Sequence, residues 1–238
     1  MRVCGESANQ GKIRLALFDI DGTLIRGGPA LRGWFQQSLH EVFGCSGALD
    51  SYDFSGKTDP QIVSELMIGA GIDPLEVSSG LDEFRSDYLQ RLGKNLSAEH
   101  LQLLPEVDEV LPRLQREGVE LGLLTGNWEG GARIKLSCFD LNRYFEFGAF
   151  GDGHFDRMGL PPVALSNARA ARGRSFSAAE TVIIGDSRLD VECARLHGIR
   201  SIAVATGWAD RADLESAGAT WVLADLGEVE KIDALTSA

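Results

Sequence analysis

The sequence has few cysteines and histidines, and none of them stand in a pattern that binds zinc. Its 238 residues include Cys4, Cys45, Cys138 and Cys193, no two of which share a CxxC spacing, and four histidines that complete no zinc motif. This spacing argues against a zinc domain, and the low count argues against a disulfide framework. We therefore expect reduced thiols in a cytoplasmic protein.

Long apolar runs and positive charge are scarce as well. No apolar run approaches the roughly 20 residues that span a bilayer, and residues 1–14 lack the apolar region of a signal peptide. Lysine and arginine number 23 against 35 acidic residues, which gives a formal net charge of −12. Such a charge repels nucleic acid and anionic membranes, so we expect neither as a partner.

The chain does contain an alternation of short apolar segments and amphipathic segments. The apolar segments predict strands, which are residues 14–20, 119–127, 144–151, 181–187, 200–207 and 220–225. Helical spacing of apolar residues between them predicts helices at residues 106–117, 129–140, 161–172, 188–197 and 210–217. Strands that alternate with helices form a parallel sheet. The predicted fold class is therefore α/β, with a Rossmann-like parallel-sheet core.

The segment after the first strand is helical throughout and too long for a simple crossover. Its predicted helices are residues 29–44, a helix capped by Thr58 or Asp59, and residues 78–93. We interpret this segment as an inserted helical cap. The predicted boundaries are an N-terminal tail at residues 1–12, a catalytic core at residues 13–26 and 99–238, and a cap at residues 27–98.

Polar residues follow three of the predicted strands, at the edge where ligands bind in open α/β sheets. They are Asp19 and Asp21 after the first, Thr125, Gly126 and Asn127 after the second, and Asp186 with Asp190 after the third. Carboxylates gathered at one edge repel one another unless a cation joins them. Because Mg²⁺ prefers oxygen ligands and keeps coordination sites for substrate phosphate, we expect a Mg²⁺ site at this edge.

These residues stand in motifs that resemble those of the haloacid dehalogenase superfamily of aspartate-nucleophile phosphatases. FDIDGTLI resembles the first motif of that family, LLTGN the second and VIIGDSRLD the fourth, and they occur in the family's order. The resemblance extends from about residue 13 to the end of the chain. The loop SGKTDPQI also resembles the cap loop of phosphoglycolate-phosphatase-like and β-phosphoglucomutase-like members.

The resemblance implies a role for each of these residues. Asp19 would be the nucleophile that forms an aspartyl phosphate, and Asp21 would be the general acid and base. Thr125 and the Gly126 N–H would bind the phosphoryl oxygens. The Mg²⁺ ligands would be Asp19, the main-chain carbonyl of Asp21, and Asp186, with Asp190 supporting them.

The third motif departs from the family pattern, in which a lysine commonly precedes the fourth motif. The only lysine between the second and fourth motifs is Lys135, which comes early, in the helix after the second motif. We prefer Arg157, because an arginine occupies the comparable place in some relatives and binds phosphate well.

Two further side chains are candidates for substrate binding. Asn127 follows the second motif, where it alternatively caps a helix. Lys57 lies in the cap loop, where it alternatively faces solvent at the start of a helix.

The predicted activity is Mg²⁺-dependent hydrolysis of a small phosphomonoester, such as phosphoglycolate or a sugar phosphate, by a monomer or homodimer. A phosphomutase of the β-phosphoglucomutase type would use the same Asp19 chemistry and return the phosphoryl group to the substrate. A 2-haloacid dehalogenase needs no acid at Asp21, and a binding protein with a degenerate site would not need all the core acids. The core motifs leave the physiological substrate open.

Overall fold

The computed structural model describes residues 11–232 and 235, and it has a parallel sheet flanked by helices with a helical cap inserted after the first strand. This arrangement confirms the predicted fold class. Residues 1–10 of the predicted N-terminal tail, including Cys4, lie outside the described residues. Cys45, Cys138 and Cys193 are free thiols.

Six parallel strands form the central sheet, in the order β5-β4-β1-β6-β7-β8. Their bounds are β1 Leu15–Phe18, β4 Glu120–Leu124, β5 Gly148–Ala149, β6 Thr181–Gly185, β7 Arg200–Val204 and β8 Trp221–Leu223. Strand β1 lies between β4 and β6, and both β1 and β6 are buried along their whole length. This burial is expected of parallel strands that helices cover on both faces.

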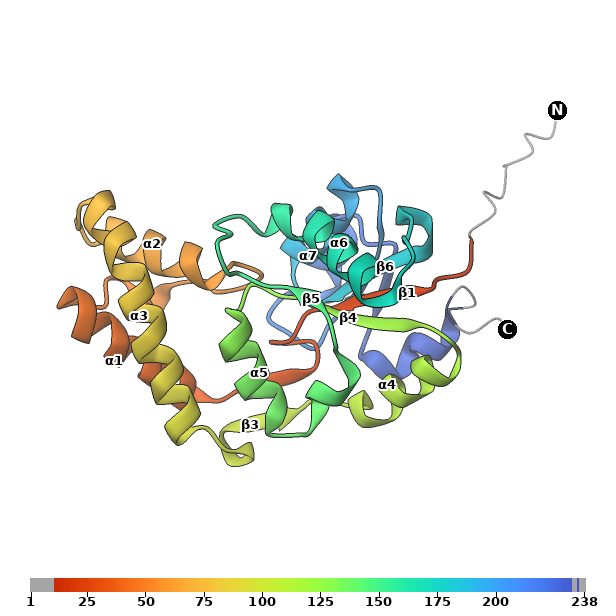
Figure 1. The fold of residues 1–238 in the computed structure, drawn as a ribbon, viewed down its shortest axis with the longest axis horizontal. Coiled ribbons are helices and arrows are strands. Elements are labelled where there is room, and N and C mark those ends of the chain that lie inside the picture. The colour runs from red at the N-terminus through yellow and green to blue at the C-terminus, as the bar shows by residue number, and fades with distance from the viewer. Residues whose placement is uncertain (1–10, 233–234, 236–238) are drawn as a thin grey trace.

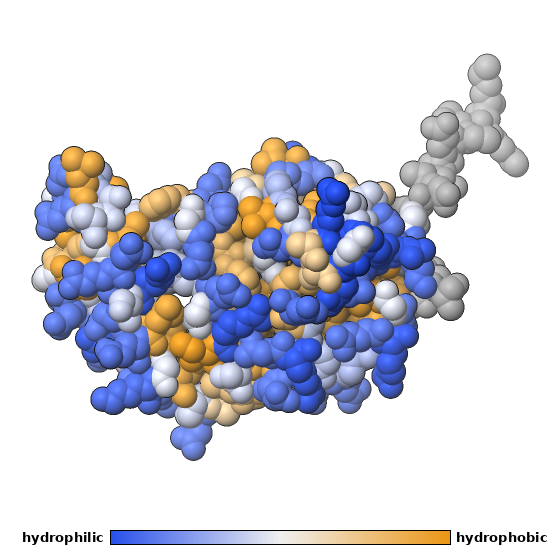
Figure 2. All heavy atoms as spheres, viewed as in Figure 1, coloured by the Kyte–Doolittle hydropathy of each residue, from blue (hydrophilic) through white to orange (hydrophobic). Residues whose placement is uncertain are grey.

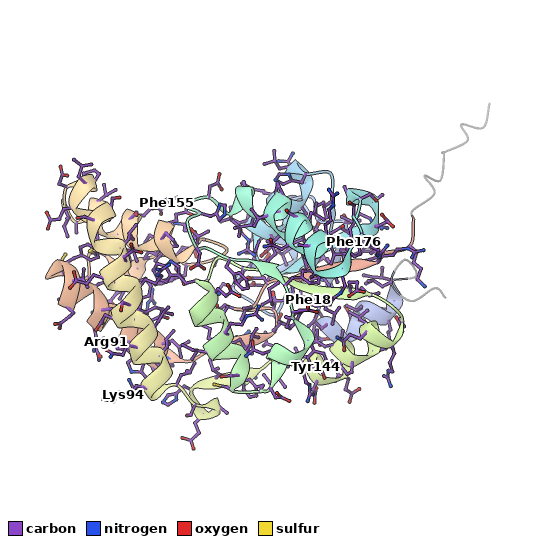
Figure 3. All side chains as sticks on the ribbon, in the orientation of Figure 1. Phe18, Arg91, Lys94, Tyr144, Phe155 and Phe176 are labelled. Atoms are coloured by element: carbon purple, nitrogen blue, oxygen red, sulfur yellow. The ribbon has the colours of Figure 1, made fainter. Side chains whose placement is uncertain are left out.

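Helices cover both sides of this sheet, with α6 and α7 above the strands and α4 and α5 below them in Figure 1. The bounds are α4 Val107–Arg116, α5 Glu129–Ser137, α6 Leu160–Arg172, α7 Arg188–Leu196 and α8 Arg211–Ser216. Short 3₁₀ helices occupy Leu49–Ser51, Ala98–His100, Leu141–Tyr144, Arg157–Gly159, Ala178–Glu180 and Leu226–Lys231. In the core, the ring of Phe18 (labelled in Figure 3) lies edge-on to another phenylalanine ring. Its partner is Phe145, at 5.8 Å between ring centroids.

The strand predicted at residues 144–151 is much shorter than expected. A 3₁₀ helix continues to Tyr144, and only Gly148 and Ala149 pair with β4. Strand β5 lies at the edge of the sheet, and among the described residues it pairs with β4 alone, so no second neighbour extends the pairing.

Three helices form the cap, at the left end of the molecule in Figure 1. They are α1 Pro29–Phe43, α2 Asp59–Gly69 and α3 Pro74–Asn95. The α1 helix begins and ends as predicted, with Pro29 in its first turn and Gly44 after it at a φ of 73°. The α3 helix begins at Pro74 rather than near residue 78, because the Asp73 carboxylate accepts the Leu75 N–H at 2.9 Å and caps it.

A small antiparallel sheet that the sequence did not predict joins the cap to the core. Its strands are β2 Ile25–Gly27 and β3 Leu101–Leu103, one on each side of the cap helices in the chain. The Gly28 N–H also donates to the His100 carbonyl at 2.9 Å. The two connections therefore lie side by side. The predicted cap boundaries at residues 27 and 98 stay a prediction.

The cap has its own aromatic cluster and also packs on the core. The ring of Phe35 lies within 5.7 Å, centroid to centroid, of the rings of Phe54, Phe84 and Tyr88. Helix α3 contacts α5, where Gly130 leaves room for the Leu89 side chain, since an added Cβ would lie 2.9 Å from it. On the face of the molecule that Figure 2 shows, the surface is mostly hydrophilic, with hydrophobic residues gathered near its middle. None of the helices in the described ranges is long and apolar enough to cross a membrane.

Candidate active site

The predicted site residues meet at the carboxyl ends of the three central strands. Asp19 and Asp21 follow β1, Thr125 follows β4 and Asp186 follows β6. Their positions are fixed by the sheet itself, because the Asp19 N–H donates to the Ile184 carbonyl at 2.9 Å and the Thr125 N–H donates to the Ala149 carbonyl at 3.1 Å. The order β4-β1-β6 therefore brings the first, second and fourth motifs to one edge.

Three buried carboxyl groups form the centre of this edge. One oxygen each of Asp19, Asp186 and Asp190 lies within 4.8 Å of the others. Burial raises the pKa of Asp19 to about 6, with the charge of Arg157 opposing the rise and that of Asp190 adding to it. Burial and the charge of Asp19 raise the pKa of Asp186 well above its usual range. Acids whose charged forms are disfavoured in this way would be stabilised by a cation.

The Arg157 side chain lies among these acids and is almost completely buried. Its Nη2 is 3.2 Å from Asp19 Oδ1, forms an ion pair with Asp190 Oδ1 and donates to the Leu124 carbonyl at 3.0 Å. Burial alone lowers the pKa of this guanidinium, but the carboxylates of Asp19 and Asp190 raise it above its usual value. A permanent positive charge is thus held beside Asp19, and the third-motif role of Arg157 stays a prediction.

The carboxylates of Asp190 and Asp186 differ in how many hydrogen bonds and ion pairs they form with neighbouring side chains. Asp190 Oδ2 accepts hydrogen bonds from Ser187 N–H at 3.1 Å and Ser187 Oγ at 2.6 Å, while Oδ1 is held by Arg157. Asp186 accepts a side-chain hydrogen bond only from Thr23, at 3.5 Å, within the described part of the chain. Asp186 therefore keeps oxygens available for a metal ion, whereas Asp190 holds Arg157 and the start of α7.

Position 22 in the first motif must be glycine, because the Asp186 carboxylate lies too close to it for any side chain. Gly22 has a φ of 86°, and a Cβ at this position would lie 2.3 Å from Asp186 Oδ2. The left-handed backbone and the lack of space both demand glycine. This explains physically why Gly22 follows Asp21.

A hydrogen-bonded network connects Asp21 to the second motif. The Asn127 Nδ2 donates to Asp21 Oδ2 at 2.9 Å and to Thr125 Oγ1 at 2.8 Å. Lys135 Nζ donates to Asp21 Oδ2 and to Asn127 Oδ1, at 2.6 Å in each case. Lys135 was not preferred as the third-motif residue because it comes early in the sequence. In the structure its ammonium binds Asp21 rather than Asp19.

The cap loop that precedes α2 lies directly on the second-motif loop. The Asp59 N–H donates to the Gly126 carbonyl at 2.8 Å, and Asp59 Oδ2 accepts the Trp128 N–H at 2.9 Å. The Gly56 carbonyl accepts from Arg157 Nη1 at 3.3 Å. Burial raises the pKa of Asp59 to about 7, and the nearby Lys135 ammonium limits the rise.

Lys57 was predicted as a substrate-binding residue, whereas the contact of Asp59 with the core was not predicted. The Lys57 ammonium is bound within the cap, to Glu65 Oε2 at 2.7 Å and the Tyr52 hydroxyl at 3.1 Å, so contact with a substrate would require these bonds to change. Its substrate-binding role stays a prediction. Asp59 was considered only as a helix cap, and its contact with Trp128 depends on how the cap docks, which no local motif encodes.

Comparison with known proteins agrees with the motifs. The sequence model described as haloacid dehalogenase-like hydrolase matches residues 16–204, which is more than half of the chain. The chain is similar to a phosphoglycolate phosphatase of Pseudomonas syringae pv. tomato, with 29% identity over 204 residues that cover 83% of this chain and 72% of the relative. A second phosphoglycolate phosphatase, from Pectobacterium atrosepticum, is 26% identical over 200 residues, 82% of each chain.

A solved structure shares the fold. The crystal structure of a hydrolase from Pseudomonas syringae matches with a TM-score of 0.69 and 22% identity, over 93% of this chain and 99% of the other. At this identity the likeness concerns the fold alone.

Proposed function

Because the chain belongs to the haloacid dehalogenase-like hydrolases, we propose that it hydrolyses a small phosphomonoester, with Mg²⁺, through an aspartyl-phosphate intermediate. The observation that carries the proposal is the buried Asp19 carboxyl, with the Arg157 guanidinium 3.2 Å away and Asp186 beside it. A nucleophile, a fixed positive charge and a set of free carboxylate oxygens are what phosphoryl transfer requires.

In the first half of the reaction, an Asp19 oxygen attacks phosphorus and the bond to the leaving oxygen breaks. Asp21 gives its proton to that oxygen, so the product leaves as an alcohol. In the second half, Asp21 takes a proton from water, the water oxygen attacks phosphorus, and the Asp19–phosphorus bond breaks. The Asp21 side chain is 42% exposed against 6% for Asp19, which suits a group that exchanges protons with leaving group and water.

The phosphoryl oxygens would be bound by main-chain and side-chain donors together with Arg157. Thr125 Oγ1 and the Gly126 N–H follow β4 at the same edge as Asp19. Arg157 stabilises the negative charge of the transferring group, since its charge lies beside the nucleophile.

The donor set at Asp19 and Asp186 fits a Mg²⁺ ion. These two carboxylates and the main-chain carbonyl of Asp21 would hold it, and all three are the oxygen ligands that Mg²⁺ prefers. When bound, the ion would neutralise charge on the carboxylates and on the phosphoryl group. Asp190 would stabilise the site through Arg157 rather than bind the ion.

The similarity to phosphoglycolate phosphatases supports phosphoglycolate as a first candidate substrate, with sugar phosphates as the other class to test. We propose a cytoplasmic enzyme that acts as a monomer or homodimer on a small phosphorylated metabolite.

The proposed function is tested by phosphate release from purified full-length chain with Mg²⁺. The panel contains phosphoglycolate, glycerol 2-phosphate, glucose 1-phosphate, glucose 6-phosphate, a nucleotide and p-nitrophenyl phosphate. We expect release of inorganic phosphate from at least one alkyl phosphomonoester. An isomerised sugar phosphate formed without inorganic phosphate would instead identify a phosphomutase, and no reaction with any compound would contradict the proposal.

The contact between the cap loop and Gly126 gives a prediction about cap docking. A Cβ on Gly126 would lie 2.1 Å from the Lys57 main-chain oxygen, which cannot move away without shifting the cap loop. Gly126→Ala is therefore expected to lower kcat/KM by about 10- to 100-fold, because the cap no longer docks correctly over the site.

The control for this change is Gly33→Ala in α1, where an added Cβ meets nothing within 4 Å. This variant should keep wild-type kinetics and gain about 0.5–1 kcal/mol in the free energy of unfolding, since alanine favours a helix over glycine. Steady-state kinetics and thermal unfolding check both variants. Wild-type kinetics in Gly126→Ala would show that the docked cap loop is not needed for turnover.

A further inference from the structure

The proposed reaction gives no role to the buried ammonium group of Lys135. Lys135 lies on α5, and its side chain is 7% exposed although it carries a charge. It shares the buried face of this helix with Gly131, Ala132 and Leu136, as expected for residues one turn apart. A buried ammonium needs hydrogen-bond acceptors, and here they are Asp21 Oδ2 and Asn127 Oδ1, each at 2.6 Å.

We infer that Lys135 is a positioning residue for proton transfer by Asp21, an inference that rests on the proposed function. The two oxygens of Asp21 have different surroundings. Oδ2 accepts hydrogen bonds from Lys135 at 2.6 Å and from Asn127 at 2.9 Å. Within residues 11–232 and 235, Oδ1 has no hydrogen-bond donor. Oδ1 is therefore the Asp21 oxygen free to face the leaving group, and Lys135 fixes the carboxyl group by its other oxygen.

Lys135 also determines the orientation of the Asn127 amide. Because the ammonium can only donate, the Asn127 atom that faces it must be the carbonyl oxygen. The Asn127 Nδ2 is then turned toward Asp21 Oδ2 and Thr125 Oγ1, at 2.9 and 2.8 Å. Lys135 thus fixes the position of Asp21 directly and, through Asn127, that of the Thr125 hydroxyl.

The contacts fit a role for Lys135 in positioning Asp21 better than a role in binding the phosphoryl group directly. Arg157 already occupies the position beside Asp19, at 3.2 Å. Lys135 pairs with Asp21, which in the proposed reaction faces the leaving oxygen. Its effect should therefore depend on whether the leaving group needs a proton.

The test compares two leaving groups in the wild type, Lys135→Met and Lys135→Arg. The substrates are the alkyl phosphomonoester hydrolysed fastest in the panel above and p-nitrophenyl phosphate, whose leaving anion is stable without a proton. Their kcat/KM values report the step in which the leaving group departs. In Lys135→Met we expect kcat/KM to fall by about 10- to 100-fold for the alkyl ester, and by less than about 3-fold for p-nitrophenyl phosphate. Lys135→Arg should recover most of the loss.

A matched control is Lys94→Met on the exposed end of α3, which should leave both kcat/KM values unchanged. Thermal unfolding verifies that each variant is folded, and Lys135→Gln replaces Lys135→Met if the methionine variant is not. Equal losses on both substrates in a folded variant, or no loss on either, would overturn the role of Lys135 and leave the phosphatase proposal intact. Failure of the wild type to hydrolyse any phosphomonoester would instead overturn both.

Discussion

Asp19→Asn is expected to abolish phosphate release, with a loss of at least about 10⁴-fold in kcat. The amide has nearly the shape of the carboxylate but is a very weak nucleophile, so no aspartyl phosphate forms. The change also leaves Arg157, whose Nη2 is 3.2 Å from Asp19 Oδ1, paired with Asp190. The folded structure should therefore persist, and the loss should appear in turnover rather than in the amount of soluble protein.

The measurement is inorganic phosphate release with the best substrate of the panel, together with thermal unfolding. Asp82→Asn on α3 serves as the control, because this side chain is 92% exposed and far from the site residues in the chain. The control should keep wild-type kcat. A folded Asp19→Asn variant that retains more than about 1% of wild-type kcat would contradict Asp19 as the nucleophile.

Removal of divalent metal is expected to have an effect of similar size. EDTA should reduce phosphate release to background, and excess Mg²⁺ should restore it, because the charge of Asp19, Asp186 and the phosphoryl group is otherwise not neutralised. Asp186→Asn should raise the Mg²⁺ concentration needed for half-maximal activity. Activity that persists in EDTA after dialysis would contradict the metal assignment.

Burial of Asp19, a ligand of the proposed metal site, makes the stability of the metal-free protein depend on pH. In the metal-free chain the pKa of Asp19 is raised from an ordinary 3.8 to about 6, so between these pH values the folded state binds more protons than the unfolded state. Stability of the metal-free protein therefore falls as pH rises through this window.

An ion at the proposed site binds deprotonated carboxylates, so we expect Mg²⁺ to raise Tm more at pH 7 than at pH 5. The gain in the free energy of unfolding is about 2.7 kcal/mol at a Mg²⁺ concentration of 100 times its Kd. Thermal unfolding at both pH values, with EDTA or Mg²⁺, measures it. An equal shift at the two pH values would mean that the ion binds elsewhere.

Much of the fold and the centre of the site were predictable because the signals are local. Asp19 and Asp186 each come directly after an apolar strand, and parallel strands bring their carboxyl ends to one edge. The choice of Arg157 rested on the resemblance, in which an arginine occupies the comparable place in some relatives, rather than on an intact third motif. The structure brings its guanidinium to Asp19 and Asp190.

What the sequence did not reveal depends on contacts between distant segments. Strands β2 and β3 have three residues each and lie on either side of the cap, so neither has a periodic signal long enough to recognise. Lys135 was set aside because its place in the sequence did not match the third motif. A charged residue on the helix face shared by Ala132 and Leu136 was a usable signal, because a lysine is rarely buried without a partner.

The way the cap meets the core affects how freely this enzyme can change during evolution. Three main-chain groups of the cap loop take part in its docking, beside the Asp59 carboxylate: the Gly56 carbonyl accepts from Arg157, the Lys57 carbonyl packs on Gly126, and the Asp59 N–H donates to Gly126. Main-chain atoms are present whatever the side chains are, so we expect these three contacts to tolerate side-chain changes at positions 57 and 59 of the cap loop. Glycines at 56 and 126 are the constraint, since an added Cβ at either would lie under 3 Å from neighbouring atoms. Under the proposed function, we expect new substrate preferences to arise through changes of cap-loop side chains while the proposed catalytic centre stays unchanged.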